Sequence, residues 1–144
     1  MSRDFNKNKV AVLTGAAKKI GRSTAIKLAE QGFNILIHTG GKSIEEAKDT
    51  IKLLEKFKIK SNYVTGDLAN LETINIIKDA ALKLGTPSVL VNNAGLRIHE
   101  HFEKIDYKDW KKVMTVNVDA SFLCAQALIN YMVKQKWGRV INIG

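Results

Sequence analysis

A turn of small and basic residues near the amino terminus has the composition of an anion-binding loop. The turn reads Thr14-Gly15-Ala16-Ala17-Lys18-Lys19-Ile20-Gly21-Arg22 and joins an apolar run to an amphipathic stretch. A tight turn in this position directs backbone N–H groups and the start of a helix at a phosphate. Gly15 would permit the sharp turn, and Gly21 would let the helix pack closely on a sheet. The loop therefore predicts a pyrophosphate site, although turns of this kind also occur as plain connections.

Four further motifs follow the loop, and they lie at Asp67-Leu68, Asn92-Asn93-Ala94-Gly95, Asn117 and 138–144. Together with the loop they resemble the motifs of the short-chain dehydrogenases/reductases: the loop is similar to that family's TGxxxGxG motif, and 92–95 matches its NNAG motif. Asp67-Leu68 stands where the family contacts the adenine, Asn117 resembles its active-site asparagine, and 138–144 resembles the strand that leads to its catalytic serine. The resemblance implies an oxidoreductase that reduces a carbonyl substrate by hydride transfer from a nicotinamide cofactor. The cofactor-binding residues it suggests are Thr14, Gly15, Ala17, Lys18, Lys19, Ile20, Gly21, His38, Lys42, Ser43, Asp67, Leu68, Asn93, Ala94 and Gly95.

One residue of the loop departs from the family pattern. Lys19 stands where the middle glycine is expected, which is similar to variants seen in pteridine reductases and some oxoacyl-carrier-protein reductases. Lysine resists the positive φ that glycine adopts readily, so the glycine pattern alone does not determine the geometry of this loop. The resemblance in the loop suggests an oxoacyl thioester or a pterin as substrate.

The end of the second predicted strand favours NADP(H) over NAD(H). An NAD-preferring site usually places a carboxylate about 20 residues past the glycine loop, where it bonds the ribose 2′-hydroxyl. The segment here reads His38-Thr39-Gly40-Gly41-Lys42-Ser43 and holds no carboxylate. Lys18 and Lys42, with His38 and the Ser43 hydroxyl, could supply charge-assisted contacts to a 2′-phosphate. The alternative for both lysines is an ordinary solvated position.

The sequence supplies only one of the four catalytic groups that the resemblance implies. In the family a tyrosine exchanges a proton with the carbonyl oxygen, a lysine lowers the tyrosine pKa, a serine orients the substrate and an asparagine holds a water. The serine is expected at or just after Gly144, and the Tyr-x-x-x-Lys motif further on. Asn117 is the candidate asparagine, and on an apolar helix stripe its amide needs a partner such as water or backbone. A purely structural role is the alternative, and we expect this chain alone to be inactive.

Apolar runs and amphipathic stretches alternate along the whole chain. This pattern predicts an α/β fold with a doubly wound, Rossmann-type parallel sheet covered on both faces. Ser43, with Glu46 three residues later, would begin a helix with a capping box, and Pro87 would lie in the turn before the fourth strand. We interpret residues 1–144 as one dinucleotide-binding domain, truncated after its fifth strand. The predicted strands are 10–13, 34–38, 62–65, 89–91 and 139–144, and the helices are 20–31, one from Ser43, 71–84 and 107–135.

Composition argues against several other classes of protein. No apolar run approaches the roughly 18 residues of a membrane span, and the polar start lacks a signal-peptide core, so we expect a cytoplasmic protein and no membrane partner. The single cysteine, Cys124, cannot form an intramolecular disulfide, and no Cys/His spacing predicts a metal site. The net charge of +9 comes from scattered lysines, without the aromatic and basic clusters of a nucleic-acid site.

The resemblance implies a small-molecule carbonyl substrate as the partner of this protein. The resemblance implies a homo-oligomer, a dimer or tetramer, when the full domain is present. His99 and His101 lie in a loop that borders the substrate cleft in this fold, with solvent exposure as the alternative. The rival interpretation of the whole chain is a catalytically silent nucleotide-binding or interaction module.

Overall fold

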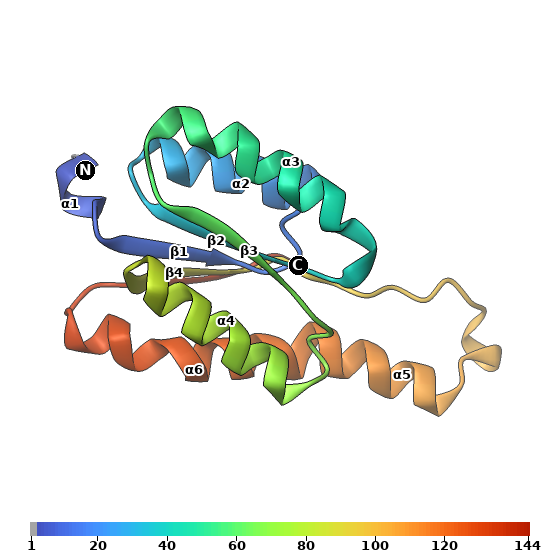
Figure 1. Ribbon diagram of the computed structural model, residues 1–144. Helices are drawn as coiled ribbons and strands as arrows, with labels where there is room; N and C mark the ends of the chain where they lie inside the picture. The colour runs from blue at the N-terminus through green and yellow to red at the C-terminus, as the bar shows by residue number, and fades with distance from the viewer. Residues whose placement is uncertain (1–2) are drawn as a thin grey trace.

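Five parallel strands form the central sheet of the computed structural model, which describes residues 3–144 (Figure 1). The spatial order is β3-β2-β1-β4-β5, and all four neighbouring pairs are parallel. The chain starts in the middle of the sheet, builds outward to β3 and then returns to the other side of β1. This arrangement confirms the predicted doubly wound sheet. The strands are β1 Lys9–Leu13, β2 Asn34–Thr39, β3 Ser61–Thr65, β4 Thr86–Asn92 and β5 Arg139–Asn142.

Helices cover both faces of the sheet. Figure 1 shows α2 and α3 on one face, and α4 with α6 on the other. A short amino-terminal helix, α1, was not predicted, because the polar start gives no periodic apolar signal. The helices are α1 Arg3–Asn6, α2 Lys19–Glu30, α3 Ile44–Leu54, α4 Leu71–Leu84, α5 Tyr107–Met114 and α6 Ala120–Lys134. Short helical turns lie at η1 Gly41–Ser43, η2 Glu55–Phe57, η3 Phe102–Lys104 and η4 Thr115–Asp119.

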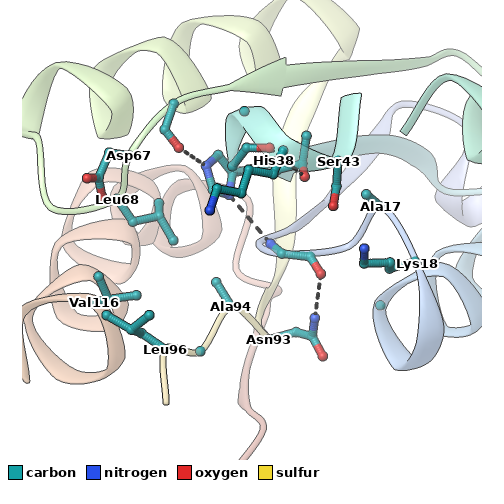
Figure 2. A pocket seen from close by; sticks show the side chains of 18 of the residues that line it. Ala17, Lys18, His38, Ser43, Asp67, Leu68, Asn93, Ala94, Leu96 and Val116 are labelled. Atoms are coloured by element: carbon teal, nitrogen blue, oxygen red, sulfur yellow. Dashed lines mark hydrogen bonds between the residues drawn. The ribbon is translucent and has the colours of Figure 1, made fainter. Parts of the chain in front are cut away.

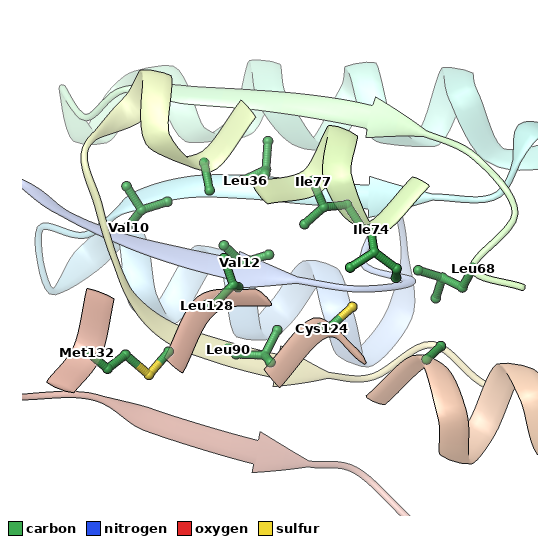
Figure 3. Packing of buried hydrophobic residues seen from close by; sticks show 12 residues of the cluster. Val10, Val12, Leu36, Leu68, Ile74, Ile77, Leu90, Cys124, Leu128 and Met132 are labelled. Atoms are coloured by element: carbon green, nitrogen blue, oxygen red, sulfur yellow. The ribbon is translucent and has the colours of Figure 1, made fainter. Parts of the chain in front are cut away.

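Alternate residues of each strand feed two separate cores. Val10 and Val12 pack with α4 and α6, whereas Ala11 and Leu13 pack with α2 and α3. The split follows from the strand geometry, since successive side chains point to opposite faces. Figure 3 shows the first core, where Leu128 of α6 is buried among strand residues. Burying a leucine side chain of this kind stabilises the fold by roughly 1.5–3 kcal/mol.

The long helix that was predicted over 107–135 is divided by a π-helical turn. The turn is η4, which places Asn117 at its centre, between α5 and α6. A π turn carries extra residues per turn and therefore shifts the face that each side chain occupies. The apolar stripe is buried in α6, where Cys124 and Leu128 belong to the core, whereas Trp110 of α5 is 48% exposed. In Figure 1, α5 extends past the ends of the strands, so this helix has no sheet beneath it.

The helix from Tyr107 to Lys134 is long and apolar enough, by length and composition, to cross a membrane. The expectation that no segment approaches this threshold is therefore wrong. Core helices of soluble proteins, which are mostly buried, pass the same test; in this helix 17% of the apolar window is buried, and Cys124, Leu128 and Met132 pack against the sheet.

Two local predictions are corrected. Pro87 lies inside β4 rather than before it, opposite Val10, where the β1–β4 register shifts. Proline lacks an N–H for the ladder, and such irregularities are where strands tolerate it. Ser43 precedes α3 but makes no side-chain cap, so the capping box is absent. The Glu46 carboxylate that would have closed the box instead bonds Lys18.

Candidate functional site

The predicted anion-binding loop follows β1, beside the segment that follows β4. Gly15 has φ +60°, and a Cβ placed there would lie 2.7 Å from the Cα of Ala94. The Thr14 hydroxyl accepts hydrogen bonds from the amides of Asn93 and Ala94, each at 3.1 Å. The Asn93 side-chain amide in turn donates from its Nδ2 to the Gly15 carbonyl at 2.9 Å. The loop and the NNAG-like segment therefore form one tightly joined unit, in which glycine is required at position 15.

Lys19 occupies the left-handed backbone conformation, which favours glycine. Its φ is +52°, and it is one of three non-glycine residues with positive φ in the part of the chain that the structure describes. Lysine therefore adopts a positive φ in this loop, although glycine takes that conformation more readily. The left-handed conformation costs an L-residue about 1–2 kcal/mol, which the surrounding contacts must offset.

The start of α2 presents free backbone donors. The first amides of a helix have no intrahelical acceptor, and here they belong to Lys19, Ile20 and Gly21. Lys18 at the N-cap makes no side-chain cap, and the first turn holds no acidic residue. These amides and the positive end of the helix dipole therefore favour an anion at this point.

A buried brace holds the loop against α3. The Ala17 carbonyl accepts from the Thr50 hydroxyl at 2.8 Å and from two nitrogens of the Arg22 guanidinium, Nε at 3.3 Å and Nη2 at 3.1 Å. The Arg22 Nη2 also donates to the Glu46 carbonyl at 3.0 Å. Thr50 is fully buried and so is its bond to the Ala17 carbonyl, whereas the bonds from Arg22 are partly buried. The loop is consequently held before any ligand arrives.

His38 belongs to this support rather than to the predicted phosphate contacts. Its Nδ1 accepts from the Gly15 amide at 3.5 Å, and its Nε2 lies 3.0 Å from the Gly66 carbonyl (Figure 2). Burial lowers the pKa of His38, against smaller raising effects of the Gly66 hydrogen bond and the Asp67 charge. The imidazole is therefore neutral, with its hydrogen on Nε2, and it cannot supply the positive charge that the sequence suggested.

A cavity of about 690 Å³ opens over the loop at the carboxyl edge of the sheet (Figure 2). Of the predicted cofactor-binding residues, only Thr14 does not line it, because the Thr14 side chain is used beneath the loop. Those that line it are Gly15, Ala17, Lys18, Lys19, Ile20, Gly21, His38, Lys42, Ser43, Asp67, Leu68, Asn93, Ala94 and Gly95. The lining residues that the sequence did not suggest are Thr39, Gly40, Gly41, Gly66, Leu96, Lys112 and Val116. Lys112 and Val116 come from the α5–η4 segment, and no sequence pattern indicated that this segment lies beside the loop.

The charged side chains of the cavity wall are mostly cationic. Lysines 18, 19, 42 and 112 face one carboxylate, Asp67, among the residues that line it. Just outside, the Lys18 ammonium lies 3.0 Å from the Glu46 carboxylate. The inference that no carboxylate lies near a 2′-phosphate is therefore corrected: 38–43 holds none, but the first turn of α3 brings Glu46 to Lys18.

Asn117 is exposed rather than buried on the apolar stripe, and its partner is backbone. Its Oδ1 accepts from the Leu96 amide at 2.7 Å, and its Nδ2 donates to the Leu96 carbonyl at 3.0 Å. These two bonds tie the π turn to the segment after β4. The predicted need for a specific partner is met, and the side chain has a positioning role; its catalytic role stays a prediction.

A second cavity, of about 1100 Å³, lies on the other side of the NNAG-like segment and borders β5. Asn117, Ser121 and Asn142 line it, and Asn93 to Leu96 line both cavities. His99 and His101 are exposed and line neither, so the structure does not bring them into the site.

The sequence contains one Tyr-x-x-x-Lys spacing that was not among the predicted site residues. Tyr107 is followed four residues later by Lys111, whose ammonium lies 5.9 Å from the tyrosine ring. Tyr107 is 71% exposed and stacks on Trp110, and neither Tyr107 nor Lys111 lines either cavity. The spacing is present, but it is not at the site.

The motifs, the sheet order and the cavity agree with a comparison against known families, in which the model described as short chain dehydrogenase matches residues 9–144. The chain belongs to this family. It is 40% identical over 136 residues to an uncharacterized oxidoreductase, YohF, of Escherichia coli strain K12, covering 93% of this chain and 53% of that protein. It is 34% identical over 142 residues to the 3-oxoacyl-[acyl-carrier-protein] reductase FabG of Staphylococcus epidermidis, covering 94% of this chain and 56% of that one.

The fold is also that of a solved structure. A crystal structure of a 3-oxoacyl (acyl-carrier-protein) reductase from Agrobacterium tumefaciens with NADP bound superposes with a TM-score of 0.85 at 24% identity. The match covers 96% of this chain and 53% of that one, and at this identity it shows the fold alone. The chain spans about half the length of the relatives it matches.

Proposed function

We propose that this chain is the cofactor-binding half of an NADP(H)-dependent short-chain dehydrogenase/reductase that reduces a carbonyl substrate. The observation that carries the proposal is the loop itself. Its helix-start amides line a cavity at the carboxyl edge of a parallel sheet, where dinucleotides bind in folds of this type. Four lysines around that cavity add a field that attracts a phosphorylated ligand.

The residues present fit a dinucleotide. Gly15 leaves no space for a Cβ beside Ala94, so the loop backbone packs directly against the segment that follows β4. The cavity volume lies within the range of small-molecule sites. When bound, the nicotinamide would supply the hydride for carbonyl reduction. The chain would hold the diphosphate at the start of α2, place the adenine beside Asp67 and Leu68, and orient the remainder along Asn93 to Gly95.

The choice of NADP(H) over NAD(H) rests on Lys18, Lys42 and Ser43, which line one wall of the cavity. A 2′-phosphate there would accept charge-assisted hydrogen bonds from the ammonium groups and a hydrogen bond from the hydroxyl. The NADP in the Agrobacterium reductase is a property of that protein. For this chain the argument rests on the charge of its own cavity.

A fluorescence titration with NADPH and NADH tests the cofactor assignment. We expect NADPH to bind more tightly, and Lys42→Gln to weaken NADPH binding roughly tenfold while leaving NADH binding unchanged. Lys52→Gln removes the same charge from an exposed position of α3 that does not line the cavity, and it should change neither affinity. Tighter binding of NADH than of NADPH would contradict the assignment.

We further propose that the 144-residue chain is catalytically silent by itself. No tyrosine of residues 3–144 lines either cavity, so within that range no phenol is placed to exchange a proton with a bound carbonyl. An NADPH oxidation assay with a panel of carbonyl compounds should therefore show no turnover. Turnover would refute this account of the site. Assembly into a homo-oligomer, an oxoacyl or pterin substrate and a cytoplasmic location stay predictions.

A further inference from the structure

The Lys18–Glu46 ion pair stands at the cavity wall that is proposed to meet the 2′-phosphate. The Lys18 Nζ and the Glu46 Oε1 are 3.0 Å apart. Lys18 lines the cavity, whereas Glu46 does not, so the lysine ammonium is bonded to a group outside the ligand space. Both side chains are partly solvent-exposed, at 49% and 37%, and a ligand can therefore reach the pair.

Glu46 is held in this place by its own backbone. Its carbonyl accepts from Arg22 Nη2 at 3.0 Å and lies 2.9 Å from the Thr50 hydroxyl, which has a single hydrogen to share between this carbonyl and that of Ala17. The same two residues bond the Ala17 carbonyl in the anion-binding loop. The first turn of α3 is thus fixed relative to the loop, and the carboxylate cannot move far from Lys18 without a rotamer change.

We propose that Glu46 is a specificity-determining residue that competes with the 2′-phosphate for Lys18 and so limits the preference for NADP(H) over NAD(H). The inference rests on the proposed function. A 2′-phosphate can use the Lys18 ammonium fully only when the Glu46 bond is given up, and the bound phosphate then faces a nearby carboxylate. An unphosphorylated ribose neither requires the Lys18–Glu46 bond to break nor brings a negative charge close to the Glu46 carboxylate. Glu46 acts through Lys18 and is a positioning residue.

The ionisation of Glu46 supports this role. The Lys18 hydrogen bond is the main reason why the pKa of Glu46 lies below its ordinary value. Glu46 therefore carries its charge at neutral pH. The opposite role is also physically possible, since a carboxylate can hold a lysine ready for an incoming phosphate. The two roles predict effects of opposite sign when the carboxylate is neutralised.

Two adenosine nucleotides isolate the effect. Adenosine 2′,5′-bisphosphate and adenosine 5′-monophosphate differ by the 2′-phosphate alone, and isothermal titration of the full 144-residue chain measures both affinities without requiring catalysis. Glu46→Gln should tighten the bisphosphate roughly two- to fivefold, the range expected for an exposed ion pair, and leave the monophosphate unchanged. In a Lys18→Gln background the gain should shrink, because the lysine through which Glu46 acts is gone.

Glu45→Gln is the matched control. Glu45 precedes Glu46 on α3, pairs with Lys48 at 2.7 Å and loses the same charge, but has no contact with Lys18. It should leave both affinities unchanged. Weaker bisphosphate binding by Glu46→Gln would overturn the inference, as would an equal change for both nucleotides or the same gain from Glu45→Gln. If neither nucleotide binds any of these chains while circular dichroism shows them folded, the proposed function fails with it.

Discussion

The two cavities beside the NNAG-like segment differ in how their walls are held. On the loop side, the Ala17 carbonyl has three donors, Thr50 is fully buried and His38 is bonded at both ring nitrogens. On the β5 side, every residue of the strand is exposed, and Phe102, in the connection that leads to α5, is 90% exposed. The wall on the loop side is therefore held by buried hydrogen bonds, whereas the β5 side is held by the Asn117–Leu96 and Asn92–Asn142 bonds beside an exposed strand. The proposed cofactor site is the better supported of the two cavities among the described residues.

A substitution at Gly15 should have the largest effect on the difference between the two cavities. Gly15→Ala places a Cβ 2.7 Å from the Ala94 Cα at a φ of +60°, and we expect a loss of about 2–4 kcal/mol in the free energy of unfolding. Because Ala94 would be displaced, nucleotide binding should fall as well. Urea denaturation and an NADPH titration measure the two effects.

Gly41→Ala is the control for that substitution, since Gly41 lines the same cavity but a Cβ there meets nothing within 4 Å. Its effect on stability should stay within about 0.5 kcal/mol. Equal effects of the two substitutions would show that the loop is not tightly joined to Ala94.

Thr50 and Ser121 compare a buried hydroxyl with a partly exposed one. Thr50→Val removes the donor to the Ala17 carbonyl and should lower the free energy of unfolding by about 1–2 kcal/mol. Ser121, on the β5 side, donates to the Asn117 carbonyl at 3.2 Å, and Ser121→Ala should cost less than about 0.5 kcal/mol. Chemical denaturation of both variants tests the difference. Similar costs would mean that the loop side is not the better supported one.

The sequence alone was sufficient to predict those features of the site that depend on local residue patterns and on the topology of the strands. Gly15, Gly21 and Asn93 mark turns after apolar strands, and parallel strands bring their carboxyl ends to one edge, so their meeting could be foreseen. The role of His38 could not be, because it depends on the Gly66 carbonyl that the β2–β3 register places beside its ring.

Two further features of the site lay beyond local patterns. The hydrogen bond between Lys18 and Glu46 joins residues that are 28 positions apart in the sequence, which a local pattern cannot reveal. The spacing of Ser43 and Glu46 instead predicted a capping box, which the structure does not contain. The π turn at Asn117 was hidden, since an apolar periodicity does not reveal one extra residue in a helix turn.

The buried imidazole of His38 predicts a pH-dependent loss of stability with a definite sign. Burial lowers its pKa in the folded chain below the ordinary 6.5, so below pH 6.5 the unfolded chain binds the proton more readily. Stability is therefore fully present above pH 6.5 and declines as the pH falls below that value, toward the depressed pKa. Protonation would also place a second donor against the Gly15 amide.

Unfolding midpoints of wild type and His38→Gln between pH 7.5 and 5 test this effect. The variant should lose less stability over that range than wild type. His99→Gln removes an exposed histidine and should behave like wild type. A His38→Gln profile parallel to that of wild type would rule out His38 as the source.

Lys19 gives the smallest expected effect, and it separates the conformation of the loop from its charge. Lys19→Gly removes a side chain held at φ +52°, and the relief of left-handed strain, less the entropy cost of glycine, should raise the free energy of unfolding by about 0.5–1 kcal/mol. Lys58 has a similar φ of +56° but does not line the nucleotide cavity, so Lys58→Gly should give the same gain. Only Lys19→Gly should also weaken NADPH binding, because it alone removes an ammonium from that cavity. Thermal melts and a titration of both variants would distinguish strain from charge; a stability loss at Lys19 alone would mean that its side chain supports the loop through contacts.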